Sequence, residues 1–432
     1  MRVDPGLPYS IIFSIYTDSE LGAVLEPYAV QLSQQGQPTL SYQKLYSHTM
    51  QAFLDQIRPE EAEIINLTTE YSPEVITRKF SKGDLRPHEF FERMTDKLYK
   101  ESIRPYIETR LNKCMGLLTG KAVYQRGKSG NPAQHEVTVI ADRVSVHFHF
   151  VRDDEGTLYY PTFRCGEEKL TFVGKDVQLI TQQPCVLLAD GKLYFFEDSL
   201  DGIKFTPFFR QWNIHIPKSS EPEYYKRFVT GVIEKHTVLA RGFKIHHIEA
   251  QPVPVITLRQ GWNNQPQLIL QFDYEREKVH LSDERKIIVK FTREGENYVY
   301  YKISRNTKAE RAHTETLETF GLKKLEGSVF GPHDKEISWP ELISYLGGIQ
   351  SSLAQAGFRI EQDTKGTRYF LGEAKTHFRK EEKNDWFDVY AEVVFGEYKF
   401  PFYRLRKYIL SNIHEFPLPD GSVAILPDAW FS

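Results

Sequence analysis

The chain has 432 residues, of which 40% are hydrophobic, 13% aromatic and 26% charged. This composition is that of an ordinary globular protein, so it excludes a disordered chain, a collagen and a coiled coil. Lysine and arginine total 55, aspartate and glutamate 58, and the net charge is −3. No global field therefore indicates a nucleic-acid or membrane partner, although a local basic face is compatible with this total. At roughly 150 residues per domain, the length indicates two to four structural units.

The three cysteines, Cys114, Cys165 and Cys185, lie far apart and form no Cys-x-x-Cys pair. Their spacing excludes a disulfide framework and a cysteine-rich zinc site, and it indicates a reducing compartment. No apolar run approaches the roughly 20 residues that a membrane-spanning helix needs. The short apolar stretch Tyr9–Tyr16 lacks a small-residue cleavage site, so we interpret it as a strand rather than a signal peptide. We therefore expect a cytoplasmic protein.

The first half of the chain changes from a helical to a strand-like pattern. After the strand at Tyr9–Thr17, a helix is expected from about Pro87, with apolar residues at three-to-four spacing up to Ile107. Pro105 should kink or end this helix. From residue 121 to 209 the period changes to two, and Asp190-Gly191 between two apolar runs is a strong hairpin signal.

The second half begins with a helix expected around Ser220, and strands return from residue 253 to 303. A further helix is predicted over residues 311–325, ended by Gly327. The next helix is the best specified, because Ser338 can cap its start while Glu341 reaches back, and Gly357 ends it. The residues after it alternate as strands with Asn, Asp and Gly turns.

Strands and helices occur in groups, without β-α-β alternation, and this grouping predicts an α+β fold of several units. We expect antiparallel β-sheets with flanking helices and no Rossmann or P-loop core. Three regions follow from the changes in pattern. They are a mostly helical α/β region over residues 1–114, an antiparallel β unit over 115–264 with a helix near 220–240, and an α+β region over 265–432.

One motif satisfies a permissive form of the phosphate-binding loop, namely Ala122-x4-Gly127-Lys128-Ser129. That chemistry needs a strand before the glycines and a helix after them, so that backbone N–H groups face the phosphate. Here Gly130, Asn131 and Pro132 follow the serine, and the chain continues into a strand. We therefore interpret the motif as the tip of a hairpin.

Two pairs of histidines are candidate metal ligands. His147 and His149 are two apart on a predicted strand, so both imidazoles point to one face, as two metal ligands do. No third or fourth ligand is placed by the sequence. His246 and His247 are adjacent and would point to opposite faces of an extended segment. Solvent-facing strand histidines explain both pairs more simply.

Two sets of carboxylates are candidates for catalytic chemistry. Asp363 with Glu373-x-Lys375 loosely resembles the acid-acid-lysine set of hairpin nucleases, in which the acids hold magnesium and the lysine stabilises a developing charge. The same spacing is common on solvated strand faces. Asp385 and Asp388 could act as paired carboxylates, but one alternation of apolar and polar positions explains them more economically.

The segment Lys399–Tyr408 interleaves basic and aromatic residues. As a short helix it would place Phe402, Leu405 and Ile409 on the core side and its basic residues opposite. Such a face could hold phosphates by charge without reading bases, and a merely solvated helix face is the alternative. The candidates for nucleic-acid contact are Arg379, Lys380, Arg404 and Lys407.

Three stretches near the carboxyl end carry a resemblance to a known family. They are Asn-Asp-Trp-Phe-Asp-Val-Tyr-Ala-Glu-Val-Val-Phe-Gly (384–396), Phe-Tyr-Arg-Leu-Arg-Lys (402–407) and Leu-Pro-Asp-Gly-Ser-Val-Ala-Ile-Leu-Pro (418–427). In this order they resemble the bacterial SWI/SNF helicase-associated region, which precedes an ATPase motor. Upstream, Arg305 with Glu315 or Glu318, Phe320, and the helix at Trp339 are similar to the preceding stretch of that family. The resemblance covers roughly residues 265–432 and is weaker over 115–264.

The resemblance implies a non-catalytic N-terminal accessory or regulatory region of a DNA-dependent ATPase, a helicase-like translocase. The family's motor carries a phosphate-binding loop, an Asp-Glu-x-His-type motif and late arginines, and none of these is in the 432 residues. We therefore expect no catalytic, cofactor-binding or metal-binding residue here, with ATP and magnesium acting on the motor.

The expected partners are the ATPase motor of the same polypeptide and double-stranded DNA, with no membrane partner. Two alternatives of other classes stay open. One is a magnesium-dependent nuclease that uses Asp363, Glu373 and Lys375, and the other is a protein-interaction scaffold that uses the aromatic β surface.

Overall fold

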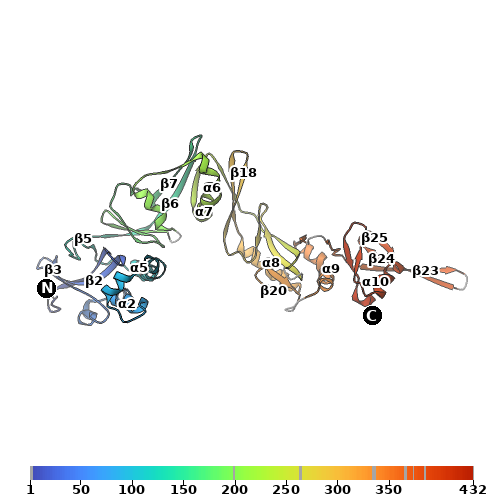
Figure 1. Cartoon of the computed structure of the whole chain (residues 1–432), viewed down its shortest axis with the longest axis horizontal. Helices are drawn as coiled ribbons and strands as arrows, with labels where there is room; N and C mark the ends of the chain where they lie inside the picture. The colour runs from blue at the N-terminus through green and yellow to red at the C-terminus, as the bar shows by residue number, and fades with distance from the viewer. Residues whose placement is uncertain are drawn as a thin grey trace. The chain divides into compact units, whose positions relative to one another are not determined.

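The structure is a computed structural model of the whole chain (Figure 1), and it describes residues 3–197, 200–261, 265–332, 337–363, 367–372, 374–383 and 386–431. The chain forms two compact units, Met1–Tyr224 with Lys235–Gly242, and Tyr225–Glu234 with Phe243–Ser432. Sheets and helices are grouped in both units, so the α+β fold class is confirmed. Among the described helices, none is long and apolar enough to cross a membrane.

The first sheet of the first unit has the strand order β3-β2-β1-β4-β5. β1 pairs in parallel with β4, whereas the other neighbours are antiparallel. This sheet is therefore mixed rather than antiparallel throughout, because the helices between β3 and β4 carry the chain back to the edge of β1. The strands are β1 (Tyr9–Asp18), β2 (Gly22–Leu32), β3 (Pro38–Lys44), β4 (Val123–Gln125) and β5 (His135–Glu136).

Helices between β3 and β4 cover this sheet. The helix expected from Pro87 is interrupted, and its last part does not end at Pro105, which lies in the first turn of α5. The first-turn N–H groups of a helix have no partner within it, so proline is tolerated there, and the π-helical turn η2 comes just before it. The helices are η1 (Met50–Gln56), α1 (Pro59–Thr69), α2 (Pro73–Phe80), α3 (Pro87–Arg93), α4 (Asp96–Leu98), η2 (Tyr99–Ile103) and α5 (Arg104–Gly116).

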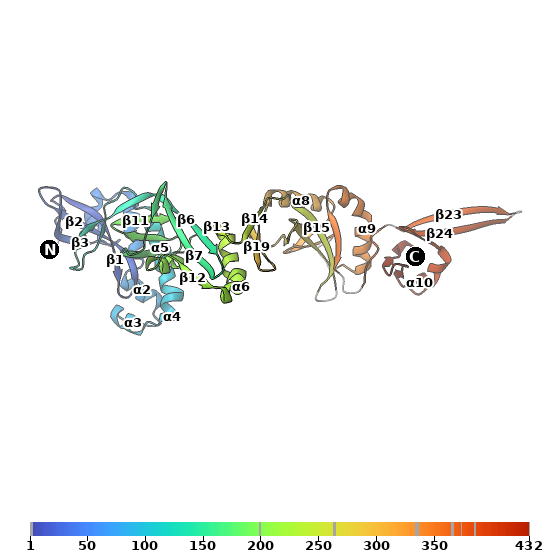
Figure 2. The ribbon, with the colours of Figure 1, turned by 90° about the horizontal axis from the view of Figure 1, so that it is seen from above.

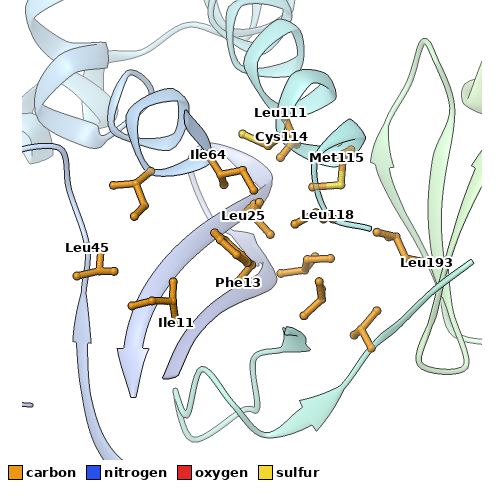
Figure 3. Close-up of a cluster of buried hydrophobic side chains, with 14 of the residues drawn as sticks. Ile11, Phe13, Leu25, Leu45, Ile64, Leu111, Cys114, Met115, Leu118 and Leu193 are labelled. Atoms are coloured by element: carbon orange, nitrogen blue, oxygen red, sulfur yellow. The ribbon is translucent and has the colours of Figure 1, made fainter. Parts of the chain in front are cut away.

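Figure 3 shows the core in which the first sheet meets α1 and α5. Phe13 and Leu25 from the sheet, Ile64 from α1 and Leu111 from α5 are fully buried, and each such side chain contributes about 1.5–3 kcal/mol by leaving water. Leu193, on the later strand β11 (Lys192–Phe196), belongs to the same core. Residues on both sides of 114 therefore share one core, which differs from the boundary expected at 114.

The second sheet of the first unit has the order β12-β7-β6-β11-β10-β9, with β13 also on β6 and β8 on β7. β6 pairs in parallel with β11 and β13, so this sheet is mixed too. The hairpin at Asp190-Gly191 is confirmed, with φ of 49° and 69° as a two-residue primed turn requires. The elements are β6 (Thr138–Arg152), β7 (Gly156–Cys165), β8 (Glu168–Leu170), β9 (Val177–Thr181), β10 (Val186–Ala189), β11 (Lys192–Phe196), η3 (Gly202–Phe209), β12 (Ile214–Pro217), η4 (Lys218–Ser220), α6 (Glu221–Tyr224) and β13 (Thr237–Arg241).

The strands of the second unit form four sheets in the described residues, with the orders β14-β19-β18, β20-β21-β16-β15-β22, β23-β24-β25 and β26-β27; β17 also pairs with β16. β15 and β16 are antiparallel neighbours on either side of residue 264, so the structure also differs from the boundary expected there. The strands are β14 (Lys244–Ile248), β15 (Val253–Gln260), β16 (Pro266–Asp273), β17 (Lys278–His280), β18 (Ile287–Glu294), β19 (Asn297–Ser304), β20 (Lys323–Glu326), β21 (Val329–Gly331), β22 (Arg359–Asp363), β23 (Ala374–Lys383), β24 (Trp386–Phe395), β25 (Tyr398–Pro401), β26 (Glu415–Pro417) and β27 (Val423–Ile425).

Helices complete the second unit. The helix predicted over 311–325 ends at Thr319, because Gly321 takes a positive φ of 79° and residues 323–326 form β20 instead. The predicted cap of α9 is confirmed, since the Ser338 side chain accepts from the Glu341 N–H and the Glu341 carboxylate accepts from the Ser338 N–H. The helices are η5 (Tyr225–Val229), α7 (Thr230–Lys235), α8 (Thr307–Thr319), α9 (Trp339–Gln355), η6 (Phe402–Leu405), α10 (Arg406–Leu410) and η7 (Asp428–Trp430).

The capping box of α9 supports a first prediction. Ser338→Ala should lower the free energy of unfolding by about 1 kcal/mol, because an N–H of the first helical turn loses its acceptor. Urea denaturation followed by circular dichroism measures this change. Ser351→Ala, an exposed serine in the interior of the same helix, is the control and should not destabilise. Equal stability of Ser338→Ala and the wild type would contradict the role of the cap.

Candidate nucleic-acid interface

The candidate surface lies on the helical segment that follows β25. Leu405 is fully buried in a core with Phe395, Phe400 and Phe416, and Phe402 and Ile409 pack against this core. The predicted apolar face of the segment is therefore confirmed. α10 ends where Asn412 takes a positive φ of 56°, a conformation that asparagine tolerates. The two helical pieces η6 and α10 thus hold the basic residues of the segment on the outside.

The basic residues of this segment are exposed and have no partner among the described residues. Residues 398–410 contain four basic and no acidic residues, namely Lys399, Arg404, Arg406 and Lys407, and all four are exposed. Within the described part of the chain none of the four side chains makes an ion pair or hydrogen bond. Surface cations elsewhere in this unit do have partners, such as Lys278 with Glu361. Unpaired cations are the groups that can neutralise phosphates.

A pocket of about 670 Å³ adjoins these cations. Trp430 lines it, and its ring centroid lies 5.7 Å from that of Phe402. Tyr403 and Leu410 stand on its rim with 72% and 74% of their surface exposed. The lining residues are Ala391, Pro401, Phe402, Tyr403, Arg406, Ile409, Leu410 and Trp430. The sequence reasoning missed this pocket, and the one signal for it was Leu410, an apolar residue beyond the core stripe.

Of the four residues predicted to contact nucleic acid, only Arg404 and Lys407 lie on this segment. Arg404 and Lys407 lie on the same exposed segment, with Arg406 and Lys399 beside them. Arg379 and Lys380 lie on β23, opposite Tyr390 and Val389 of β24, and their side chains are outside the described part of the structure. In the described strands, β25 pairs only with residues 392–395 of β24, and beyond that point β23 and β24 form a long two-stranded ribbon (Figure 2).

The turn of the last hairpin has the geometry that its Asp-Gly-Ser sequence indicates. Asp420 accepts hydrogen bonds from the backbone N–H and the hydroxyl of Ser422, at 3.0 and 2.7 Å. These bonds hold the pKa of the Asp420 carboxyl below its usual value. Gly421 takes a positive φ of 81°, which favours glycine. The turn joins β26 to β27 beside the helical segment's core.

The other predicted carboxylates do not form a site in the described residues. Asp363 ends β22, opposite Arg259 of β15, whereas Lys375 lies in a different sheet, on β23. Glu373 and Asp385, and the side chain of Asp388, are outside the described part of the structure. Among the residues that are described, no group of three or more His, Cys, Asp or Glu could hold a metal ion.

The structure places the loop of Gly127-Lys128-Ser129 and two of the candidate histidines, His149 and His246. Residues 126–134 join the antiparallel strands β4 and β5, so the loop with Gly127-Lys128-Ser129 is a hairpin tip as predicted. The ring of His149 stacks on Tyr160 with centroids 4.7 Å apart, and Nε2 lies 2.9 Å from the Thr162 hydroxyl. Burial lowers the pKa of His149, which favours its neutral form. His246 stacks on Tyr301.

One ion cluster that the sequence reasoning missed is centred on Glu26 of β2. Its carboxylate forms ion pairs with Lys44 and Arg126 and accepts hydrogen bonds from the hydroxyls of Tyr16 and Tyr28, at 2.8 and 2.5 Å. Burial opposes ionisation of Glu26, but the neighbouring cations and the Tyr28 hydroxyl outweigh it and lower its pKa. Lys44 and Arg126 lie 18 and 100 residues from Glu26 in sequence, so no local pattern signals the cluster.

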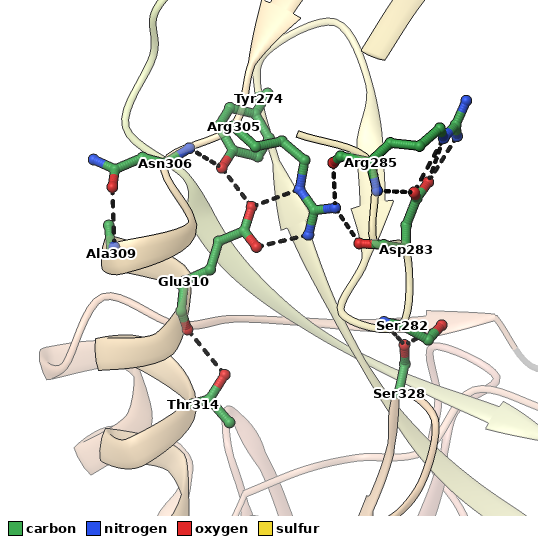
Figure 4. A network of polar contacts seen from close by, with 10 residues as sticks. All are labelled: Tyr274, Ser282, Asp283, Arg285, Arg305, Asn306, Ala309, Glu310, Thr314 and Ser328. Atoms are coloured by element: carbon green, nitrogen blue, oxygen red, sulfur yellow. Dashed lines mark hydrogen bonds and ion pairs between the residues drawn. The ribbon is translucent and has the colours of Figure 1, made fainter. Parts of the chain in front are cut away.

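A second ion cluster lies at the start of α8 (Figure 4). Arg305 donates two hydrogen bonds to Glu310, at 2.9 and 2.7 Å, and both side chains are almost fully buried. The Tyr274 hydroxyl donates to the same carboxylate at 2.5 Å and accepts from the Asn306 N–H at 2.9 Å. Arg305 thus pairs with Glu310. The cluster joins the start of α8 to the residues that follow β16 and β19.

Comparison with protein-family models, with curated proteins and with solved structures gives no match. The class that the fold defines is α+β, with mixed and antiparallel sheets in two compact units. One surface of the second unit combines exposed cations with an adjoining pocket, namely the segment of Lys399, Arg404, Arg406 and Lys407.

Proposed function

We propose that the chain is a non-catalytic accessory or regulatory region of a SWI/SNF-family DNA-dependent ATPase, a cytoplasmic helicase-like translocase. In this role it contacts the backbone of duplex DNA and the ATPase motor of the same polypeptide, while ATP and magnesium act on the motor. The observation that supports the proposal best is that Lys399, Arg404, Arg406 and Lys407 are exposed and form no ion pair or hydrogen bond with the residues the structure describes. The resemblance of residues 384–396, 402–407 and 418–427 to that family also supports it.

Contacts of this kind do not depend on base sequence. Lysine and arginine side chains that neutralise phosphates release condensed counterions, and each contact changes the logarithmic salt slope of binding by about 0.9. A carboxylate that already pairs with a cation would compete with the phosphate for it. Cations without such a partner therefore bind phosphate most strongly. We therefore expect weak, salt-sensitive binding to duplexes of any sequence.

The test is the triple variant Arg404→Ala, Arg406→Ala and Lys407→Ala. At low salt it should bind a duplex at least about tenfold more weakly than the wild type, and its salt slope should fall by about 2 to 3. Fluorescence anisotropy on two duplexes of unrelated sequence measures both quantities.

The matched control removes three cations that already have partners in the same unit. Lys278, Lys290 and Arg359 pair with Glu361, Glu277 and Asp273, and their alanine triple variant loses the same charge. It should keep most of the affinity. The proposal for DNA is wrong if the wild type shows no binding at low salt, or if both triple variants lose affinity equally.

A further inference from the structure

The pocket beside the basic segment has the form of a groove along one helical face. Phe402 and Tyr403, then Arg406, then Ile409 and Leu410 follow each other at the spacing of successive helical turns. At about 1.5 Å per residue these positions extend over roughly 10 Å. Trp430 of η7 and Ala391 of β24 also line the groove. This length equals that of the anchors at positions i, i+3 or i+4, and i+7 of a partner helix.

The exposed apolar side chains distinguish this groove from a small-molecule pocket. Sites for small ligands enclose most of the ligand's surface, whereas Tyr403 and Leu410 stand out from the surface with 72% and 74% of their area exposed. Ile413, which follows α10, is also 45% exposed. Tryptophan, tyrosine and arginine, which all line the groove, are the residue types enriched at the centres of protein interfaces.

The charges around the groove select the chemistry of the partner. Arg404, Arg406, Lys407 and Lys399 are exposed and have no ion-pair partner in the described residues. A segment that buries the apolar side chains brings its own flanking residues next to these cations. Acidic flanks would be attracted and basic flanks repelled, which sets both the orientation and the specificity of docking.

We infer that the groove between the segment 402–410 and Trp430 receives an amphipathic α-helix whose apolar stripe is flanked by aspartate and glutamate. The inference rests on the proposed function, since it names the chemistry of the motor segment that the region contacts. Docking covers Tyr403 and Leu410 and pairs the acidic flanks with Arg406 and its neighbours.

The experiment uses the full chain and a labelled synthetic amphipathic peptide of about 16 residues, with leucines at helical spacing and glutamates beside them. A second peptide carries lysines in place of the glutamates, and a third has the scrambled composition of the first. By fluorescence anisotropy the glutamate peptide should bind in the micromolar range, and the other two at least about tenfold more weakly.

The double variant Tyr403→Ser and Leu410→Ser should weaken binding of the glutamate peptide at least about tenfold. Leu325→Ser, which changes a leucine with 44% exposure elsewhere in the unit, is the control and should leave it unchanged. Duplex binding, measured in parallel, should be retained by the double variant because the cations are intact.

These readouts separate the docking inference from the proposed contact with DNA. Equal affinity for the glutamate and scrambled peptides overturns the inference while leaving duplex binding as evidence for the proposed function. Peptide binding without duplex binding supports the groove and contradicts the DNA contact. Binding to phosphatidylserine vesicles that the double variant abolishes, without peptide binding, also overturns the inference, because the occupant would be a lipid surface.

Discussion

Replacing Arg305 by alanine is expected to lower the free energy of unfolding by about 3–5 kcal/mol, because it leaves a buried carboxylate without its cation. The side chains of Arg305 and Glu310 are only 3% and 4% exposed. Arg305 also donates to the backbone carbonyls of Asp283 and Arg285 (Figure 4). The substitution therefore removes hydrogen bonds from three segments that meet at the start of α8.

Arg285→Ala is the matched control for this prediction. Arg285 lies beside the same cluster (Figure 4) and pairs with Asp283 and Glu234, but its side chain is 57% exposed. Water screens such pairs, so the loss should be below about 1 kcal/mol. The double variant Arg305→Met and Glu310→Met should be more stable than Arg305→Ala, since no unpaired charge stays buried. Urea denaturation of all variants measures these differences, and equal losses for Arg305→Ala and Arg285→Ala would refute the argument.

Replacing Glu26 by glutamine is expected to destabilise the first unit by about 3 kcal/mol at neutral pH, since Lys44 and Arg126 are left facing each other without a counter-charge. Their side chains are 27% and 20% exposed and that of Glu26 is 11% exposed, so water reaches the cluster only in part. The guanidinium of Arg126 lies 3.4 Å above the Tyr16 ring, which holds it at the carboxylate. Thermal or urea unfolding of the two proteins measures the difference.

The destabilisation by Glu26→Gln should depend on pH. The folded-state pKa of Glu26 lies below its ordinary value of 4.5, so its charge stabilises the fold fully above 4.5 and ceases to do so as the pH falls through the folded-state pKa. Below that pH the wild-type carboxyl is neutral, as glutamine is, and the two proteins should approach equal stability. Glu277→Gln, from the exposed pair with Lys290, should cost less than about 1 kcal/mol at any pH. A difference for Glu26→Gln that stays constant down to low pH would contradict the assignment.

The distance along the chain between interacting residues explains which elements could be predicted. The cap of α9 and the Asp190-Gly191 turn depend on residues within four positions of each other, so their chemistry is visible in the sequence. α8 ends earlier than predicted because Gly321 takes a positive φ before Gly327 is reached, and the pairing of β20 with β21 then takes the residues that follow. Strand pairing competes with helix extension, and a local pattern does not show which partner strand is near.

The candidate site also has features that the local sequence predicts and features that it does not. The apolar face of residues 402–409 and the exposure of Arg404 and Lys407 follow from helical spacing. The groove does not, since Trp430 and Ala391 reach it from other elements.

By itself, the sequence determined the α+β class, the capped and hairpin elements and the basic outer face of the segment 402–410, because these depend on neighbours along the chain. Only the tertiary structure decided the parallel pairings of β1 with β4 and β6 with β11, the shared core across residue 114, and the partners of Glu26. Such contacts join residues far apart in sequence, and their stability comes from burial that exists only once the whole unit has folded.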